Sequence, residues 1–361
     1  MSGSNSCDMD YTQRIPPEIL TEIFLYASVC ADEIFEPHDP PWLLGRICTR
    51  WRALALSIPS LWCSLMIVAS RVEILLPSSS LVPLISAYIE RSAQLPLKLT
   101  LDPHWSRNNP PLLDLFLSPS ISKRWEDVAL FDLIEGTALA HRKQHILPAL
   151  ESGDFACLKT LRFERCHLMG EPSTIISLPT LTSLTLVSSP TEILKCLSTP
   201  HLEHLRLESS PCDLFLQHVR SFLRRSDYSL TRLGWVNTQV EDVKLLNLLS
   251  IFPNLTELDL YCASSRISTI SDAFLAGLHS RKGVVPKLKC LSLGGRIYGS
   301  PDGLVDLLES RSQEYLGSDE TACSPLLSVQ LYPSKPFDVQ LRSRLLALAD
   351  SGMEIGGRWV H

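Results

Sequence analysis

The sequence lacks the short motifs that most often identify a catalytic or nucleotide-binding protein. It contains no G-x-x-x-x-G-K-[ST], no G-x-G-x-x-G, no G-x-S-x-G and no H-E-x-x-H. These motifs mark phosphate-binding loops, dinucleotide sites, hydrolase nucleophiles and zinc proteases. Without any of them, the sequence predicts a protein that is not an enzyme and that holds no metal or cofactor.

Features of secreted and membrane proteins are also missing. The 11 cysteines are scattered from Cys7 to Cys323 without a C-x-x-C pair, unlike the dense framework of a small disulfide-rich domain. The first residues are polar and acidic, with no basic segment followed by an apolar run. The most apolar stretch, residues 54–69, contains Pro59 and Trp62 and is too short to span a bilayer. We therefore expect a soluble protein of a reducing compartment, cytoplasmic or nuclear, without a membrane partner.

Charge is modest overall but uneven near the N-terminus. The net charge is −6, with 45% hydrophobic and 20% charged residues, which is a globular composition. Acidic residues dominate from Asp8 to Asp39, whereas residues 40–72 contain no acid and include Arg46, Arg50 and Arg52. Arginines next to Trp51 would suit stacking on nucleic acid, but three arginines can contact only a few phosphates of a nucleic-acid backbone. A basic flank facing an acidic protein explains them as well, and we predict no nucleic-acid partner.

Histidines and cysteines offer little further chemistry. His141 and His145 are spaced to share a helix face, but Arg142 and Lys143 lie between them and no third ligand is apparent. We interpret this segment as solvated. In the dipeptide Cys166-His167 we interpret the cysteine as a buried structural residue at the end of a strand. His201 and His204 flank a repeat leucine.

Two helical patterns open the chain. In "RIPPEILTEIFLYASVC", Pro16 and Pro17 suit a first helical turn, and an apolar stripe follows. After an acidic loop, a second stripe keeps helical spacing until Pro59. The apolar residues of these stripes are Ile19, Leu20, Ile23, Phe24 and Ala27, then Leu43, Leu44, Ile47, Trp51, Leu54, Ala55 and Ile58. Residues up to 65 are therefore expected to form a small bundle of short helices.

A repeated pattern occupies most of the remaining chain. Apolar residues recur in the order L-x-x-L-x-L, and the first positions of successive units lie 21 residues apart (Leu181 to Leu202) to 38 residues apart (Leu288 to Leu326). Such repeats, usually about 20–29 residues long, are typical of leucine-rich repeats. The units begin at Trp125, Leu158, Leu181, Leu202, Leu230, Leu255, Leu288 and Leu326.

Helical patterns lie between these units, so each repeat is expected to bury its apolar face against its neighbours. The fold prediction is an α/β protein in which a short helical bundle precedes an irregular leucine-rich-repeat solenoid, with parallel strands on the concave side and helices on the convex side. An extended segment, "LPLKLTL", and a terminal strand in "GMEIGGRWVH" complete it.

Residues between the repeat leucines are expected to point to the concave face, because side chains alternate along a strand. The mixed signs of their charges favour a protein target over nucleic acid. The predicted substrate-binding residues are Arg162, Glu164, Arg206, Glu208, Arg232, Asp259 and Tyr261, within a wider surface that includes Thr185, His204, Glu257, Ser292, Gln330 and Tyr332.

The N-terminal segments "IPPEILTEIFLYA" and "LLGRICTRWRALALSIPSLWCSL" resemble an F-box domain of the kind common in large fungal families. The resemblance covers about residues 13–63, and it implies binding to an Skp-family adaptor of a cullin–RING ubiquitin ligase, with the repeats recruiting a target protein. Ile15 replaces the usual leucine, and the acidic loop before Pro41 is long. By position, the adaptor-binding residues would be Ile15, Pro16, Ile19, Leu20, Ile23, Phe24, Leu43, Leu44, Ile47 and Trp51.

The implied organisation is a flexible tail at 1–12, an F-box at 13–65, linking helices with a first repeat or cap at 66–120, and leucine-rich repeats at 121–361. The implied function is the substrate-recognition subunit of an SCF-type ligase. A repeat scaffold that works outside any ligase is the alternative.

Overall fold

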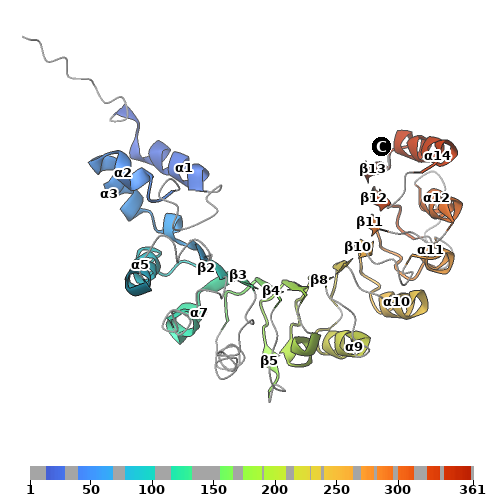
Figure 1. The fold of residues 1–361 in the computed structure, drawn as a ribbon, viewed down its shortest axis with the longest axis horizontal. Helices are drawn as coiled ribbons and strands as arrows, with labels where there is room; N and C mark the ends of the chain where they lie inside the picture. Colours follow the sequence, from blue (N-terminus) through green and yellow to red (C-terminus); the bar gives the residue numbers. More distant parts are fainter. Residues whose placement is uncertain are drawn as a thin grey trace, which may run out of the picture. The chain divides into compact units, whose positions relative to one another are not determined.

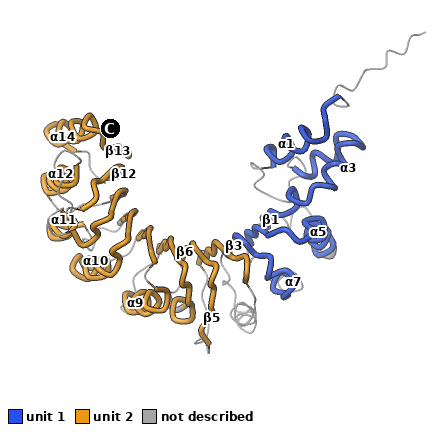
Figure 2. The backbone as a smooth tube through the Cα atoms, turned by 180° about the vertical axis from the view of Figure 1, so that it is seen from behind, with its two compact units in different colours: residues 1–131 blue, residues 132–361 orange. Residues whose placement is uncertain are grey.

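The computed structural model contains two compact units, residues 1–131 and residues 132–361 (Figures 1 and 2). It describes residues 14–28, 40–67, 78–101, 115–131, 155–165, 174–188, 191–208, 215–227, 229–236, 240–262, 270–279, 283–295, 300–312, 323–333 and 337–358. The predicted tail at 1–12 lies outside these ranges.

Unit 1 begins with short helices: α1 (Pro17–Ser28), α2 (Leu44–Ile47), α3 (Thr49–Ser57) and the 3₁₀ helix η2 (Pro59–Trp62). The second helical pattern, which runs up to Ile58, is interrupted at Cys48, where the backbone is extended (φ −156°, ψ 171°). The Cys48 Sγ accepts a hydrogen bond from the Trp51 N–H at 3.4 Å, so Cys48 takes the N-cap role of a serine or threonine. The pattern is therefore divided between two short helices, α2 and α3.

The rest of unit 1 is α/β. The elements are β1 (Ser64–Ile67), α5 (Ser78–Arg91), β2 (Leu97–Leu101), α7 (Pro119–Ser122) and β3 (Trp125–Phe131). The three strands are parallel, and Leu65, Leu99 and Val128 are aligned in adjacent strands. The extended segment predicted at "LPLKLTL" is confirmed as β2, whereas β1 begins inside the stretch predicted to be only helical.

Unit 2 contains a large parallel sheet whose order follows the chain. Its strands are β4 (Thr160–Glu164), β6 (Ser183–Val187), β8 (His204–Glu208), β9 (Arg232–Val236), β10 (Glu257–Cys262), β11 (Cys290–Gly295), β12 (Ser328–Pro333) and β13 (Glu354–Gly357). Equivalent repeat positions align across the sheet: Leu184, Leu205 and Leu233 pair in successive strands. This register is that of a solenoid-like α/β fold, and β13 confirms the predicted terminal strand.

Backbone hydrogen bonds at the strand starts repeat in the same way. The carbonyl of Thr182 accepts from the amide of His204, that of Glu203 accepts from Arg232, and that of Thr231 accepts from Glu257. Beneath this ladder the repeat leucines are buried, with Leu205 and Leu258 each 1% exposed. Stacking of neighbouring repeats therefore supplies the core of this unit.

The described helices of unit 2 lie on one side of its sheet (Figure 1). They are η5 (Thr191–Lys195), α9 (Phe215–Arg225), α10 (Asp242–Leu249), α11 (Asp272–Leu278), α12 (Pro301–Ser310) and α14 (Val339–Asp350). A small second sheet pairs β5 (Ile176–Ser177) with β7 (Leu197–Ser198). One of the helical patterns expected between the repeat units, at residues 191–198, is instead the η5 turn followed by β7. In the described part of the chain, no helix has both the length and the apolarity needed to cross a membrane.

Candidate functional site: two apolar helix faces and a polar hollow

Helix α1 has one buried face and one exposed apolar face. Leu20 and Phe24, four residues apart, are fully buried. Ile19 is 51% exposed, Ile23 is 45% exposed and Tyr26 is 83% exposed, and these three lie along a second side of the helix at helical spacing. The sequence prediction missed Tyr26, although its position seven residues after Ile19 was a usable signal.

Helix α2 repeats this arrangement on a smaller scale. Leu44 is buried, whereas Leu43 is 39% exposed and Ile47 is 50% exposed, one turn apart. The predicted adaptor-binding set thus divides into residues that reach solvent and residues that support them from the core.

Three further members of the predicted set, Trp51, Ile15 and Pro16, make contacts within the helical bundle. The Trp51 ring lies 4.9 Å from the Phe24 ring, centroid to centroid, and is half-buried. The Arg50 guanidinium donates to the carbonyl of Ile15 at 2.6 Å, which anchors the segment before α1. Pro16 is exposed, and its carbonyl accepts from the amide of Leu20 at 3.1 Å. Trp51 therefore links α3 to α1 more than it faces solvent.

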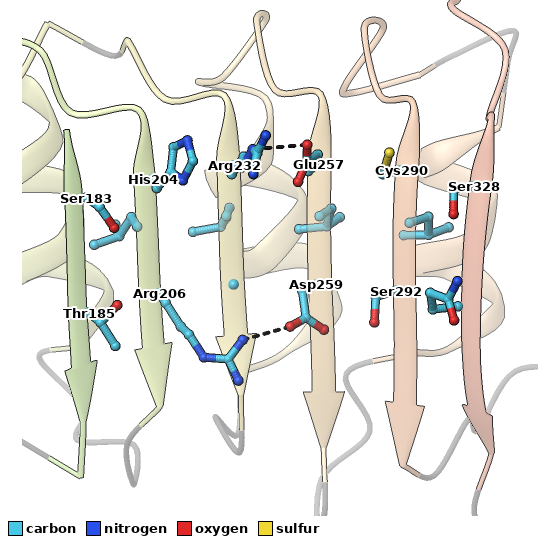
Figure 3. Close-up of a pocket in the computed structure, with 16 residues that line it drawn as sticks. Ser183, Thr185, His204, Arg206, Arg232, Glu257, Asp259, Cys290, Ser292 and Ser328 are labelled. Atoms are coloured by element: carbon cyan, nitrogen blue, oxygen red, sulfur yellow. Dashed lines mark hydrogen bonds and ion pairs between the residues drawn. The ribbon is translucent and has the colours of Figure 1, made fainter. Parts of the chain in front are cut away.

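In unit 2, the sheet face that the helices leave uncovered carries a hollow of about 320 Å³ (Figure 3). We call it the sheet hollow. Its polar lining comes from two positions in each strand, the third and fifth of the L-x-x-L-x-L unit. These residues are Ser183, Thr185, His204, Arg206, Arg232, Glu257, Asp259, Cys290, Ser292, Ser328 and Gln330.

A glycine in the middle of the hollow lets two charged residues meet. Arg206 on β8 and Asp259 on β10 flank Gly234 on β9 in register. The Arg206 guanidinium contacts the Asp259 carboxylate at 2.9 Å (Figure 3). A Cβ at Gly234 would lie 3.1 Å from Cγ of Arg206, so a larger side chain there would require the arginine to shift.

The charges of the hollow are arranged by strand. Bases stand on β8 and β9 and acids on β10, with a second contact of 3.0 Å between Arg232 and Glu257. The strands to either side contribute small or neutral groups, among them Thr185, Ser292 and Gln330. The hollow therefore offers a basic edge and an acidic edge within one surface, and its ion pairs are exposed enough to exchange with charges of a ligand.

The structure brings together only part of the predicted substrate-binding set. Arg206, Arg232 and Asp259 line the hollow. Arg162 and Glu164 pair with each other on β4 at 2.9 Å. Glu208 is 4.0 Å from Arg206 on the same strand. Tyr261 is 40% exposed and lies over Gly294 of the next strand.

Residues that the prediction omitted also line the hollow: Ser183, Cys290 and Ser328. They occupy the same repeat position as His204 and Arg232, so strand alternation could have found them.

The chemistry of the hollow favours binding. Burial, followed by the nearby Glu257 carboxylate, raises the pKa of the Cys290 thiol, so the thiolate needed for nucleophilic attack is disfavoured. His204 lies three strands away from Cys290, roughly 14 Å at the usual strand spacing. The two therefore form no Cys–His pair. Among the described residues, no group of three or more histidine, cysteine or acidic side chains could hold a metal ion.

Four residues considered from the sequence, His141, His145, Cys166 and His167, lie outside the described residues. Comparison with known proteins found neither a family model nor a curated protein that matches this chain.

Proposed function

We propose that the chain is a non-catalytic substrate-recognition subunit of an SCF-type cullin–RING ubiquitin ligase. In this proposal residues 13–65 act as an F-box that binds an Skp-family adaptor, and leucine-rich repeats in the remaining chain recruit a target protein. The observation that carries the proposal is the solvent exposure of Ile19, Ile23, Leu43 and Ile47. The resemblance assigns these same positions to the adaptor interface.

Physical reasoning supports an obligate interface at these helices. A bundle of this size buries little apolar surface by itself, yet α1 and α2 each leave an apolar face in water. Exposed aliphatic side chains at helical spacing, beside a larger aromatic such as Tyr26, fit a helix-in-groove interface. Leu20, Phe24 and Leu44 are buried and would contribute by holding the exposed residues in place.

The sheet hollow supports the second half of the proposal. Protein surfaces present positive and negative side chains close together. The hollow has a basic edge at Arg206 and Arg232 and an acidic edge at Glu257 and Asp259. A nucleic-acid ligand would meet the carboxylates unfavourably. The proposal therefore names a protein target, a reducing cytoplasmic or nuclear location and no nucleic-acid partner.

The first test is recovery of a purified Skp-type adaptor by the tagged full-length chain. Replacing Ile47 by glutamate puts a charge at the proposed interface while leaving the buried residues unchanged, so the fold should survive. We expect Ile47→Glu to lower adaptor affinity by about tenfold or more, the effect of losing an interface hot spot.

A matched control comes from unit 2. Leu346 on α14 is 54% exposed, close to the 50% of Ile47, and Leu346→Glu should recover as much adaptor as the native chain. Equal recovery by all three proteins would contradict the assigned interface.

The alternative function is a repeat scaffold that works outside any ligase. Recovery of a cullin together with the adaptor from cell extract supports the ligase. Recovery of the adaptor alone, at an amount that saturates the chain, would favour the scaffold.

A further inference from the structure

Unit 1 contains a second pocket, of about 280 Å³, that the proposed function does not use. We call it the arginine pocket. It is lined by Pro41, Trp42, Gly45, Arg46, Arg52, Ala55, Leu56, Trp62 and Arg91. These residues come from α2 and the turn before it, α3, η2 and the last turn of α5, so the fold gathers positions far apart in the sequence.

Three cations converge on this pocket, and no carboxylate is among the described residues that line it. Arg46 and Arg52 are exposed. The Arg52 Nε–H donates to the carbonyl of Gly45 at 2.6 Å, which fixes the side chain and leaves its terminal nitrogens for a ligand. Within the described part of the chain, none of the three arginines forms an ion pair. Among the residues that the structure describes, these three guanidinium charges therefore have no acidic partner.

The wall behind these cations is rigid and aromatic. Trp62 is 2% exposed, and its indole N–H donates to the carbonyl of Ala55 at 2.9 Å. The rings of Trp42 and Tyr88 meet it edge-on at 5.8 and 4.8 Å. The Arg91 guanidinium lies 4.5 Å above the Trp62 ring. Arg91 is therefore held in place before any ligand arrives.

The arginine pocket uses other residues than the proposed adaptor interface. Gly45 and Arg46 of α2 line the pocket, whereas Leu43, just before this helix, and Ile47, at its end, are the exposed apolar residues assigned to the adaptor. On α3 the pocket residues Arg52, Ala55 and Leu56 follow helical spacing. A ligand here could bind whether or not the adaptor proposal holds.

We propose that the arginine pocket binds a phosphomonoester dianion attached to an apolar carrier. A phosphate offers three acceptor oxygens and nearly two negative charges, which several guanidinium groups can share. A carboxylate offers two oxygens and one charge and would leave part of the cluster uncompensated. Trp42 and Leu56 provide apolar surface for the carrier, such as an aromatic ring. The carrier can be a phosphorylated side chain of a protein or a free small molecule.

The test is a calorimetric titration of the full-length chain at low ionic strength with three probes: phenyl phosphate, a phosphotyrosine peptide and benzoate. We expect phenyl phosphate to bind and benzoate to bind at least about tenfold more weakly. A peptide that binds more tightly than phenyl phosphate identifies a protein-borne ligand, and equal affinities identify a free phosphomonoester. Absence of binding by both phosphate probes, or benzoate binding as tightly as phenyl phosphate, overturns the proposal.

Variants locate the site. Arg46→Gln and Arg52→Gln should each weaken phenyl phosphate binding by about tenfold, the effect of losing a charge-assisted hydrogen bond. Arg224→Gln, at an exposed position on α9, removes the same charge elsewhere and should bind like the native chain. Unfolding midpoints recorded for each protein separate loss of the ligand contact from loss of the fold. Equal weakening by the Arg224 variant would mean that only net charge is sensed, and would overturn the assignment.

Discussion

Among single residues, Asp242 at the start of α10 combines a buried oxygen with a shifted pKa. Ser271 donates a hydrogen bond to its Oδ2, while its Oδ1 is buried without a described partner. Burial raises the pKa of this carboxyl above its ordinary value. The folded state holds the proton of Asp242 more tightly than the unfolded chain does. The charged carboxylate therefore destabilises the folded state, and this cost is fully present at a pH above the pKa of the folded state. That cost is relieved as the pH falls towards the ordinary value.

Asp242→Asn tests whether the buried charge of Asp242 destabilises the folded state. Asparagine keeps an oxygen that can accept from Ser271 but carries no charge to desolvate. We expect the variant to have a higher urea midpoint than the native chain at pH 7, and the difference should shrink as the pH is lowered through the raised pKa. A difference that grows on acidification would contradict the assigned cause.

Sequence reasoning found the apolar stripe of α1 but could not say which half of it is buried. Ile19 and Leu20 are neighbours of similar hydrophobicity, yet one is half-exposed and the other fully buried. The difference depends on where α3 packs, which is tertiary information. The arginine pocket was missed for a similar reason, since Arg91 joins Arg46 and Arg52 only after folding.

At the scale of elements, arginines clamp successive segments together. Arg124 donates to the carbonyl of Leu95, Arg225 to those of Leu194 and Leu197, and Arg311 to that of Val285. Each arginine donates to carbonyl groups of an earlier segment, and the carbonyl of Val285 also accepts from the amide of Leu288. The clamp therefore stabilises the stacking of neighbouring segments.

The clamp predicts a difference between two adjacent residues of α9. Arg225→Met should lower the free energy of unfolding by about 2–3 kcal/mol, because hydrogen bonds from a charged group are lost and the carbonyls of Leu194 and Leu197 lose their donor. Arg224→Met, next to it and exposed, should change the free energy by less than about 0.5 kcal/mol. Urea unfolding of both variants gives the comparison. Equal effects would show that the clamp does not contribute.

The L-x-x-L-x-L pattern located the strands of the large sheet because the same leucines that define the pattern form its core. The elements that it missed are those without that pattern. Strands β5 and β7 have two residues each, too short for any period. Helix α11 is also short, and it starts at a cap in which the Ser271 hydroxyl accepts from the Phe274 N–H at 3.4 Å. The break at Cys48 was hidden because a thiol cap is weaker and rarer than a hydroxyl cap.

Across the whole molecule, the two units present surfaces of different chemistry. Unit 1 exposes aliphatic side chains on α1 and α2, together with the arginine pocket. Unit 2 presents a polar hollow with paired charges. Apolar helix faces suit a stable interface, and exposed ion pairs suit an exchangeable one. The proposed function, a receptor that holds one partner firmly and exchanges another, requires such a division.

The most direct test of that account is amide hydrogen exchange of the full-length chain with and without a saturating Skp-type adaptor. We expect slower exchange in α1 (Pro17–Ser28) and α2 (Leu44–Ile47), no change in strands β8 to β10, and loss of the protection in Ile47→Glu. Unchanged exchange in both helices, or protection confined to the strands of unit 2, would contradict it.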